Sequence, residues 1–415
     1  MGVLRGINPL RGIIMIVPAF IVITAMLFHA SVNAAGPKYG GTLSLATEMD
    51  SRGFDAIKAP VLAGTGIFTA NLVMERLFNT GENGTLTPIL GLSATPSQDG
   101  KTWIVKLRKG VKFHDGTPFN ADAVVKHWRR MLDPKNRYRG LLLLRPILSV
   151  EKAGEYEVRF LLKHPWLPFT AALSDPRRFT ALIPSPKAVE DGVQHRSPVG
   201  TGPFVFKEWK TADHIEVVKN PDYWQKGKPY LDNIILRPIS DHQSRYAALA
   251  SGQVDIILTD RPGYVKKLSG DPNFATNVLE YGGVGFLALN NSKPPLDDVR
   301  VRRALAHAWD QKKYIKACFK NILPYAEHWL GDDLNCGDVG YRAPDLKKAR
   351  ALIAEYGKPV EVEYIHSATN RGRETGVIVQ QLFKKIGVKV NTSAMNFPAI
   401  MKQMFSKKLK LRQNN

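Results

Sequence analysis

The chain has 415 residues, of which 44% are hydrophobic and 23% are charged. That length allows two or three domains, and the composition is that of an ordinary folded protein. The formal net charge is +21, but lysine and arginine occur singly or in pairs, without the basic tail or the aromatic-basic alternation of nucleic-acid binders. We therefore expect no nucleic-acid partner.

Residues 1–35 have the layout of a secretory signal peptide. Two arginines precede an apolar run over residues 13–28, and small residues around Ala34 and Ala35 offer a cleavage point. The run is short for a membrane span and contains Pro18, which favours cleavage over an uncleaved anchor. Because no cysteine lies near the cleavage point, we expect a free exported protein rather than a lipoprotein.

Hydrophobic periodicity predicts alternating strands and helices along the rest of the chain. Strands are expected at residues 42–46, 101–113, 155–162, 204–210, 214–220, 233–239, 254–258, 281–291, 360–366 and 388–392. Helices are expected at residues 67–78, 121–132, 243–250, 299–309, 344–356 and 371–387. The strand-helix-strand order within residues 233–258 favours mixed or parallel α/β packing.

The stretch VKFHDGTPFNADAVVKHW, residues 111–128, places His114 beside Asp115. An aspartate can orient a catalytic imidazole, so the pair is a candidate for acid–base chemistry. No nucleophile motif accompanies it, however, the DGTP residues are typical of a turn, and Asn120 is a good N-cap for the following helix. We interpret the stretch as a strand, a tight turn with exposed polar side chains and a capped helix.

Other motifs also favour a structural interpretation. The segment VGTGPF, residues 199–204, lacks the third glycine of a dinucleotide fingerprint and predicts a close backbone turn. Cys318 and Cys336 form either a disulfide or two free thiols. Four polar residues could be imagined around a metal ion, but their spacing is not that of a known metal site, so we interpret their segment as a polar loop. They are His328, Asp332, Asp333 and Cys336. Without an enzyme signature in the chain, we expect no catalytic residue, cofactor or metal.

Two loops carry paired arginines that suit an anionic group. Arg137 and Arg139 lie after a predicted helix, and a planar guanidinium matches the geometry of a carboxylate. The loop HSATNRGRE, residues 366–374, leads into a predicted helix, whose N-terminal amides favour an anion next to Arg371 and Arg373. For both loops, solvated surface arginines remain the alternative interpretation.

Several long blocks, in this order, resemble the family 5 extracellular solute-binding proteins of ABC importers, the peptide- and nickel-binding class. The similarity runs from about residue 38 to about residue 405. The blocks are YGGTLSLATEMD, GKTWIVKLRKGVKFHDGTPFNADAVVKHWRRMLDP, SPVGTGPFVFKEWK, NPDYWQKGKPYLDNIILRPISD, SGQVDIIL, FLALNNSKPPLDDVRVRRALAHAWDQKKYI and DLKKARALIAEYG.

The resemblance implies an α/β, two-lobe periplasmic binding protein fold (class II type) with an extra subdomain. Residues 36–56 and 170–282 would form lobe I, residues 57–169 the inserted subdomain, and residues 283–415 lobe II. The implied function is closure of a monomer on a peptide or similar small polar solute and delivery to the membrane permease of an ABC transporter. Ligand contacts to both lobes would favour the closed state, since only that state offers both sets.

The ligand surfaces of the family resemble four places in this chain. They imply these ligand-binding residues: Glu48, Met49, Arg137, Arg139, Tyr281, Gly283, His366 and Arg373. The chain departs from the family pattern after FPAIMKQMFSKK, where it stops with LKLRQNN. We therefore expect lobe II to be truncated, with exposed sheet edges and weakened or absent ligand binding. The alternative functions are a non-transport exported protein, either chaperone-like or a non-functional remnant, and an exported hydrolase.

Overall fold

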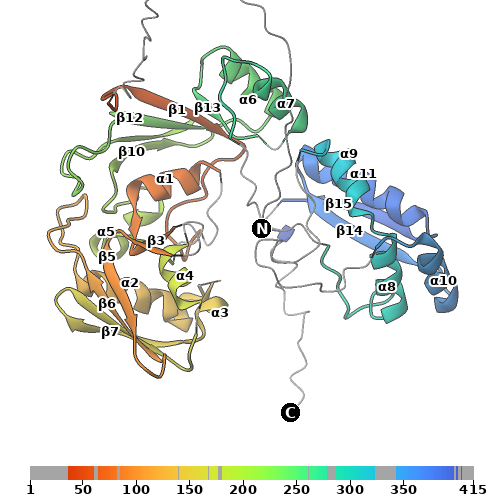
Figure 1. Cartoon of the computed structure of the whole chain (residues 1–415), viewed down its shortest axis with the longest axis horizontal. Helices are drawn as coiled ribbons and strands as arrows, with labels where there is room; N and C mark the ends of the chain where they lie inside the picture. The colour runs from red at the N-terminus through yellow and green to blue at the C-terminus, as the bar shows by residue number, and fades with distance from the viewer. Residues whose placement is uncertain are drawn as a thin grey trace, which may run out of the picture.

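The structure is a computed structural model of the whole chain (Figure 1). The residues that it describes are 36–59, 64–81, 85–138, 140–166, 168–175, 180–259, 261–277, 287–322, 343–396, 399–400 and 403. Residues 1–35, most of the expected strand at 281–291, and the polar group from His328 to Cys336 lie outside the described residues. Within the described part, no helix has the length and apolar character needed to cross a membrane.

A five-stranded mixed sheet, in the order β10-β11-β12-β1-β13, combines strands that are far apart in sequence. β1 (Thr42–Thr47) pairs in parallel with β12 (Asn233–Pro238) and β13 (Ile256–Ile257). β10 (Phe204–Lys210) and β11 (His214–Lys219) form an antiparallel hairpin that continues onto β12. The predicted hairpin and the predicted unit of β12, α6 (His242–Ala250) and β13 are thereby confirmed. We call this sheet with its helices lobe I.

A second sheet, which is antiparallel, is formed by strands between residues 91 and 162, and α2 (Ala121–Leu132) packs against it. Its strands, in spatial order, are β5 (Gly91–Pro96), β6 (Thr102–Leu107), β8 (Glu157–Leu162) and β7 (Ile147–Gly154). The Asn120 side chain accepts a hydrogen bond from the Ala123 amide at 3.1 Å, which confirms the predicted cap. The apolar face of α2 is buried, and Trp128 at its centre is completely inaccessible.

The helix expected at residues 67–78 is wrong at its C-terminal end. α1 spans Thr65–Val73, and the chain then becomes extended in β2 (Glu75–Arg76) and β3 (Phe78–Thr80). The buried Glu75 carboxylate accepts hydrogen bonds from Thr201 Oγ1, Tyr223 Oη and Trp224 Nε1 at 2.7–2.9 Å. These long-range partners hold Glu75 in an extended segment, so tertiary contacts override the helical periodicity of the sequence.

The remaining elements of the first 280 residues are short. They are β4 (Leu86–Pro88), a 3-10 turn η2 (Pro134–Asn136), α3 (Leu141–Leu144), α4 (Phe169–Ser174), β9 (Leu182–Ile183), α5 (Pro186–Glu190), a 3-10 turn η3 (Val193–His195) and α7 (Pro262–Ser269). β2 pairs with β9 and β3 pairs with β4, both antiparallel.

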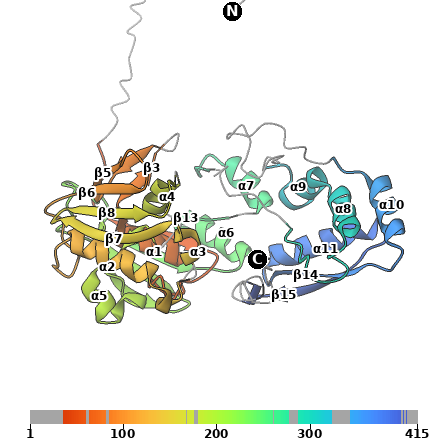
Figure 2. The same ribbon diagram turned by 90° about the horizontal axis from the view of Figure 1, so that it is seen from below.

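The C-terminal part has a hydrophobic core of its own. Its two parallel strands are β14 (Glu361–Ser367) and β15 (Lys389–Met395), and its helices are α8 (Val299–Ala308), α9 (Gln311–Phe319), α10 (Leu346–Tyr356) and α11 (Asn370–Lys384). Gly357 stops α10 with φ 74°, as its position predicts. We call this unit lobe II. Figure 2 shows β5–β8 and β14–β15 at opposite ends of the molecule, with α6 and α7 between them.

Candidate functional site

The parallel strands of lobe I end at a common edge. β1 ends at Thr47, whose carbonyl accepts a hydrogen bond from the Ile239 amide at 2.8 Å just after β12, and the Leu258 amide after β13 bonds to the Ala46 carbonyl at 3.1 Å. The segment after β1, starting with Glu48, therefore lies beside the start of α6. In open α/β sheets, ligands bind outside the carboxyl ends of the strands, which makes this edge a candidate site.

The two strands of lobe II end in the same way. β14 and β15 run in parallel to Ser367 and Met395, and the Ala368 amide bonds to the Met395 carbonyl at 2.9 Å. Thr369 then caps α11, accepting a hydrogen bond from the Gly372 amide at 3.1 Å. The carboxyl edge of lobe II thus also carries the N-terminus of a helix.

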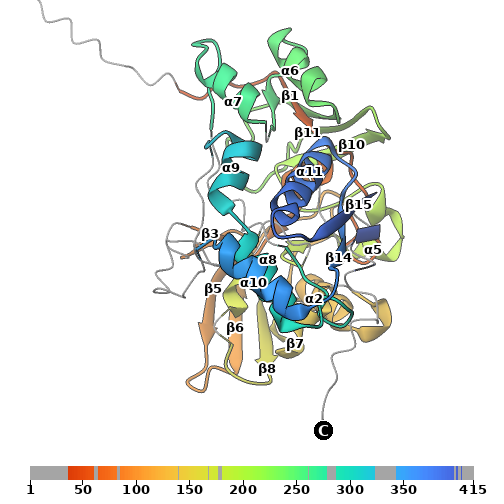
Figure 3. The ribbon, with the colours of Figure 1, turned by 90° about the vertical axis from the view of Figure 1, so that its right-hand side faces the viewer.

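These two edges face each other across a polar contact. One guanidinium nitrogen of Arg261, the residue before α7, lies 2.9 and 2.8 Å from the two carboxylate oxygens of Glu374 in α11. A second contact, at 3.5 Å, joins His242 in α6 to Asn370 in α11. Figures 1 and 3 show α7 next to α9, and Figure 1 shows β1 and β14 running toward each other. The described residues thus bring the carboxyl ends of both parallel sheets together.

Asp50 fixes the loop that follows β1, and sequence reasoning missed it. Its carboxylate accepts hydrogen bonds from Trp209 Nε1 at 3.1 Å, the Ala212 amide at 2.9 Å and Thr65 Oγ1 at 3.2 Å. The loop is also tied to α1, because the Thr65 amide bonds to the Met49 carbonyl at 2.9 Å. These contacts hold Glu48 and Met49 at the edge of lobe I.

The predicted site residues differ in their surroundings. Glu48 is half-buried, and Met49 is 42% exposed at the carboxyl end of β1. Arg137 is exposed in the left-handed conformation (φ 51°) after η2. Three further predicted positions, Arg139, Tyr281 and Gly283, lie outside the described residues, whereas His366 and Arg373 lie within them.

In the loop over residues 366–374, fewer charged side chains are available to bind an anion than the sequence indicates. His366 is buried, and its ring packs against Gly376 of α11. Arg371 donates to the Cys318 carbonyl at 2.6 Å and stacks over Phe319. Arg373 is exposed and donates to the Ala368 carbonyl at 2.9 Å and to the Asn370 side chain. Of the two arginines in this loop, Arg373 is therefore the more accessible to an anion.

His114 has a structural role that corrects the expected exposure of this turn. Its Nε2 lies 2.9 Å from the Gly202 carbonyl, its amide bonds to the Gly200 carbonyl, and burial lowers the pKa of its ring. Asp115 instead bonds to Ser185 and Thr117, so the two adjacent side chains form no dyad. The segment VGTGPF packs closely against the end of α1, since a Cβ on Gly200 would clash with the Val73 carbonyl oxygen.

A cavity of about 310 Å³ lies elsewhere in the N-terminal half, between α2 and α5. Ala123, His127, Pro184 and Val189 line part of it, with Lys126 and Glu190 paired at its rim. None of the predicted ligand residues lines this cavity. The candidate site therefore remains the pair of facing strand edges.

Comparison with known proteins identifies the family. Residues 85–414 match the model of the bacterial extracellular solute-binding proteins, family 5. The chain belongs to this family. The resemblance of its sequence blocks is thus confirmed, and so is the two-lobe periplasmic binding protein fold. Members of the family bind small-molecule or peptide ligands and work with ABC permeases.

Individual relatives of this family 5 protein bind different solutes. A di/tripeptide-binding protein of Pseudomonas aeruginosa is 31% identical, over 91% of this chain and 76% of its own length. A nickel-binding periplasmic protein of Escherichia coli is 28% identical, over 78% of this chain and 66% of its own length. The periplasmic binding protein DppA of Helicobacter pylori, solved with the peptide STSA, is 26% identical with a TM-score of 0.77, over 88% of this chain and 76% of that one.

Proposed function

We propose that this family 5 protein captures a peptide or a similar small polar solute between lobe I and lobe II and delivers it to the membrane permease of an ABC importer. The observation that carries the proposal is the contact from Arg261 to Glu374, which brings the carboxyl ends of the two parallel sheets together. A solute held there touches both lobes only when they are closed, so binding favours closure.

Charge at the two edges favours a zwitterionic peptide. Glu48 supplies a carboxylate on lobe I for an amino group, and the exposed Arg373 supplies a guanidinium on lobe II for a carboxylate. The peptide named with the Pseudomonas relative and with the Helicobacter structure supports the same class. A nickel chelate is the second solute class, because the E. coli relative is a nickel-binding protein.

The proposal includes the organisation and processing of the chain. Lobe I would comprise residues 36–56 and 170–282, the inserted subdomain residues 57–169, and lobe II residues 283–415. Residues 1–35 would be removed on export to the periplasm, and the mature protein would act as a monomer without catalytic activity. The hydrogen bond between His114 Nε2 and the Gly202 carbonyl supports this last point, since it engages one of the two ring nitrogens that a hydrolase could use.

A ligand screen on the mature chain tests the proposal. Thermal-shift measurements would compare dipeptides, tripeptides, longer peptides, opines, nickel chelates and sugars, because a ligand of the folded state raises the melting temperature. Calorimetry on the best peptide would then compare Glu48→Gln and Arg373→Gln, each expected to weaken binding about tenfold. Lys126→Gln, on the exposed face of α2, is the control. A best ligand with no amino or carboxylate group, or equal affinity in all variants, would contradict the proposal.

A further inference from the structure

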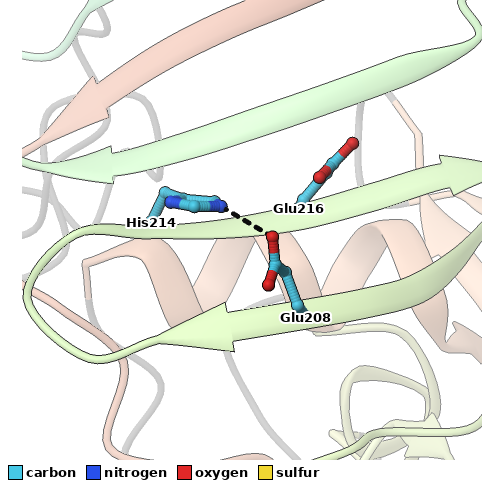
Figure 4. Close-up of side chains that lie close together, drawn as sticks. All are labelled: Glu208, His214 and Glu216. Atoms are coloured by element: carbon cyan, nitrogen blue, oxygen red, sulfur yellow. Dashed lines mark hydrogen bonds and ion pairs between the residues drawn. The ribbon is translucent and has the colours of Figure 1, made fainter.

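Three side chains on the hairpin of β10 and β11 have the composition of a metal site (Figure 4). Strand pairing places Glu208 directly opposite Glu216, and His214 lies two residues before Glu216 on the same face of β11. One potential ligand atom from each side chain lies within 4.8 Å of those of the other two, and Nε2 of His214 is 3.2 Å from Glu208 Oε1. The backbone of a paired hairpin thus preorganises the group.

The electrostatics of the group favour a cation. Two carboxylates directly opposite each other on antiparallel strands repel. Lys207 lies 3.1 Å from Glu216 and Lys210 lies 3.3 Å from Glu208, but both lysine side chains are more than half exposed. Ion pairs of exposed lysines contribute little, because solvent screens them and ordering a long side chain costs entropy. Both lysines can therefore turn into solvent when a multivalent cation replaces them.

The other nitrogen of the imidazole, Nδ1, lies close to a carboxylate but makes no hydrogen bond in this arrangement. Asp213 Oδ2 lies 3.0 Å from Nδ1 of His214, and Arg237 lies 3.2 Å from the other oxygen of Asp213. Metal-ligating histidines usually direct their second nitrogen to a carboxylate, which orients the ring and makes the first nitrogen a better ligand. A small rotation of the Asp213 side chain would give His214 this partner when a metal ion binds. The His214 ring is also largely buried, with 13% of its surface exposed. Its Nε2 is oriented by the hydrogen bond with Glu208 Oε1.

We propose that Glu208, His214 and Glu216 bind one divalent transition-metal ion of the Zn²⁺ type on the outer face of lobe I. Bonds of about 2.0–2.2 Å to nitrogen and oxygen require ligand atoms roughly 3.3 Å apart, so rotation of the glutamate side chains closes the observed separations. Water completes the coordination. The imidazole selects this class, because Ca²⁺ and Mg²⁺ prefer shells made only of oxygen.

The site is separate from the proposed solute site. Ile215 and Val217 alternate with the ligand residues along β11 and are buried in the core that includes α1, so the metal group lies on the opposite face of the sheet. The same hairpin supplies Trp209 and Ala212, which hold Asp50 in the loop after β1. An ion that joins β10 to β11 stabilises the hairpin on which this loop depends.

Calorimetric titration of the chelator-treated mature chain with ZnCl₂ at pH 7.5 tests the proposal. We expect one ion per chain in the micromolar range and a higher melting temperature, with no such effect of MgCl₂ or CaCl₂. His214→Gln and Glu216→Gln should each weaken Zn²⁺ binding at least tenfold, and Asp213→Asn about tenfold, because it removes the carboxylate next to Nδ1 of His214. His164→Gln is the matched control, since His164 is an exposed histidine on another surface.

A second readout locates the ion independently of affinity. Co²⁺ substituted for Zn²⁺ should give visible absorption bands of a four- or five-coordinate site in the native chain and in His164→Gln, but not in His214→Gln. Metal-free melting temperatures within about 2 °C of the native value show that the variants fold. Absence of saturable Zn²⁺ binding, or equal affinity in the native chain, His214→Gln and Glu216→Gln, would overturn the proposal. Neither result depends on which solute the lobes bind.

Discussion

Replacing Glu374 with glutamine tests whether the contact with Arg261 belongs to the closed, solute-bound state. The contact has two short distances, 2.8 and 2.9 Å, and a guanidinium that is 12% exposed, but the carboxylate is 51% exposed. A charge-assisted contact with one solvated partner contributes about 1 kcal/mol, between the values for exposed and buried pairs. Losing 1 kcal/mol from the closed state alone lowers its population relative to the open state about fivefold.

The solute binds the closed state, so its dissociation constant should rise by the same factor of about five. Calorimetry with the best peptide ligand would measure this change in Glu374→Gln, in Arg261→Gln and in the double variant. In the double-mutant cycle, a coupling free energy near 1 kcal/mol is expected, because each single substitution already breaks the contact. Asp191→Asn is the control, since Asp191 directly follows α5, which contains its partner Lys187, and the pair does not join the lobes.

An unchanged dissociation constant in Glu374→Gln would refute this reasoning. It would mean that the contact persists equally in the open and closed states, or that the facing edges do not form the solute site. A loss of affinity in Asp191→Asn equal to that in Glu374→Gln would refute it as well, because a general change of surface charge would then explain both results.

Other predictions concern stability. His114→Gln should leave solute affinity unchanged and cost about 1 kcal/mol in urea unfolding, because it loses the contact with the Gly202 carbonyl; a large loss of affinity in a folded variant would contradict this. Burial lowers the pKa of His127 to about 4. Below pH 6.5, the unperturbed pKa, His127 is protonated more readily in the unfolded chain than in the folded one. The folded state therefore loses stability as the pH falls from 6.5 toward 4, roughly 2 kcal/mol of it by pH 5. His127→Gln should reduce this pH dependence of the free energy of unfolding. Identical pH profiles of the native chain and the variant would contradict this role of His127. Asn120→Ala should lower the free energy of unfolding by about 1 kcal/mol, because it removes the cap of α2. Equal urea midpoints for the native chain and the variant would contradict this. Glu75→Gln should cost about 1–3 kcal/mol, since an amide cannot accept all three hydrogen bonds; an unchanged urea midpoint would contradict it.

Local signals predicted much of the fold. The apolar spacing of α2, its cap at Asn120 and the stop of α10 at Gly357 depend on neighbouring residues, so they can be read from the sequence. The order of strands and helices predicted the parallel unit of β12, α6 and β13 for the same reason. The end of α1 could not be predicted, because the burial of Glu75 depends on partners more than 120 residues away.

The candidate site could be predicted only in part. The end of β1 and the start of α11 follow from the strand and helix boundaries, whereas their contact depends on Arg261 and Glu374, which are 113 residues apart. Asp50 was missed because its partner Trp209 is 159 residues away. By contrast, part of the proposed metal site could have been predicted from the sequence. Once β10 and β11 are predicted to form a hairpin, the alternation of side chains places His214 and Glu216 on one face of β11.

Small-angle X-ray scattering of the mature chain, with and without its best peptide ligand, tests the central claim most directly. Closure of lobe I onto lobe II should lower the radius of gyration on binding in the native chain, and Glu374→Gln should need a higher peptide concentration to reach the same compact state. A radius of gyration that stays constant while calorimetry shows saturable peptide binding would contradict capture between the lobes.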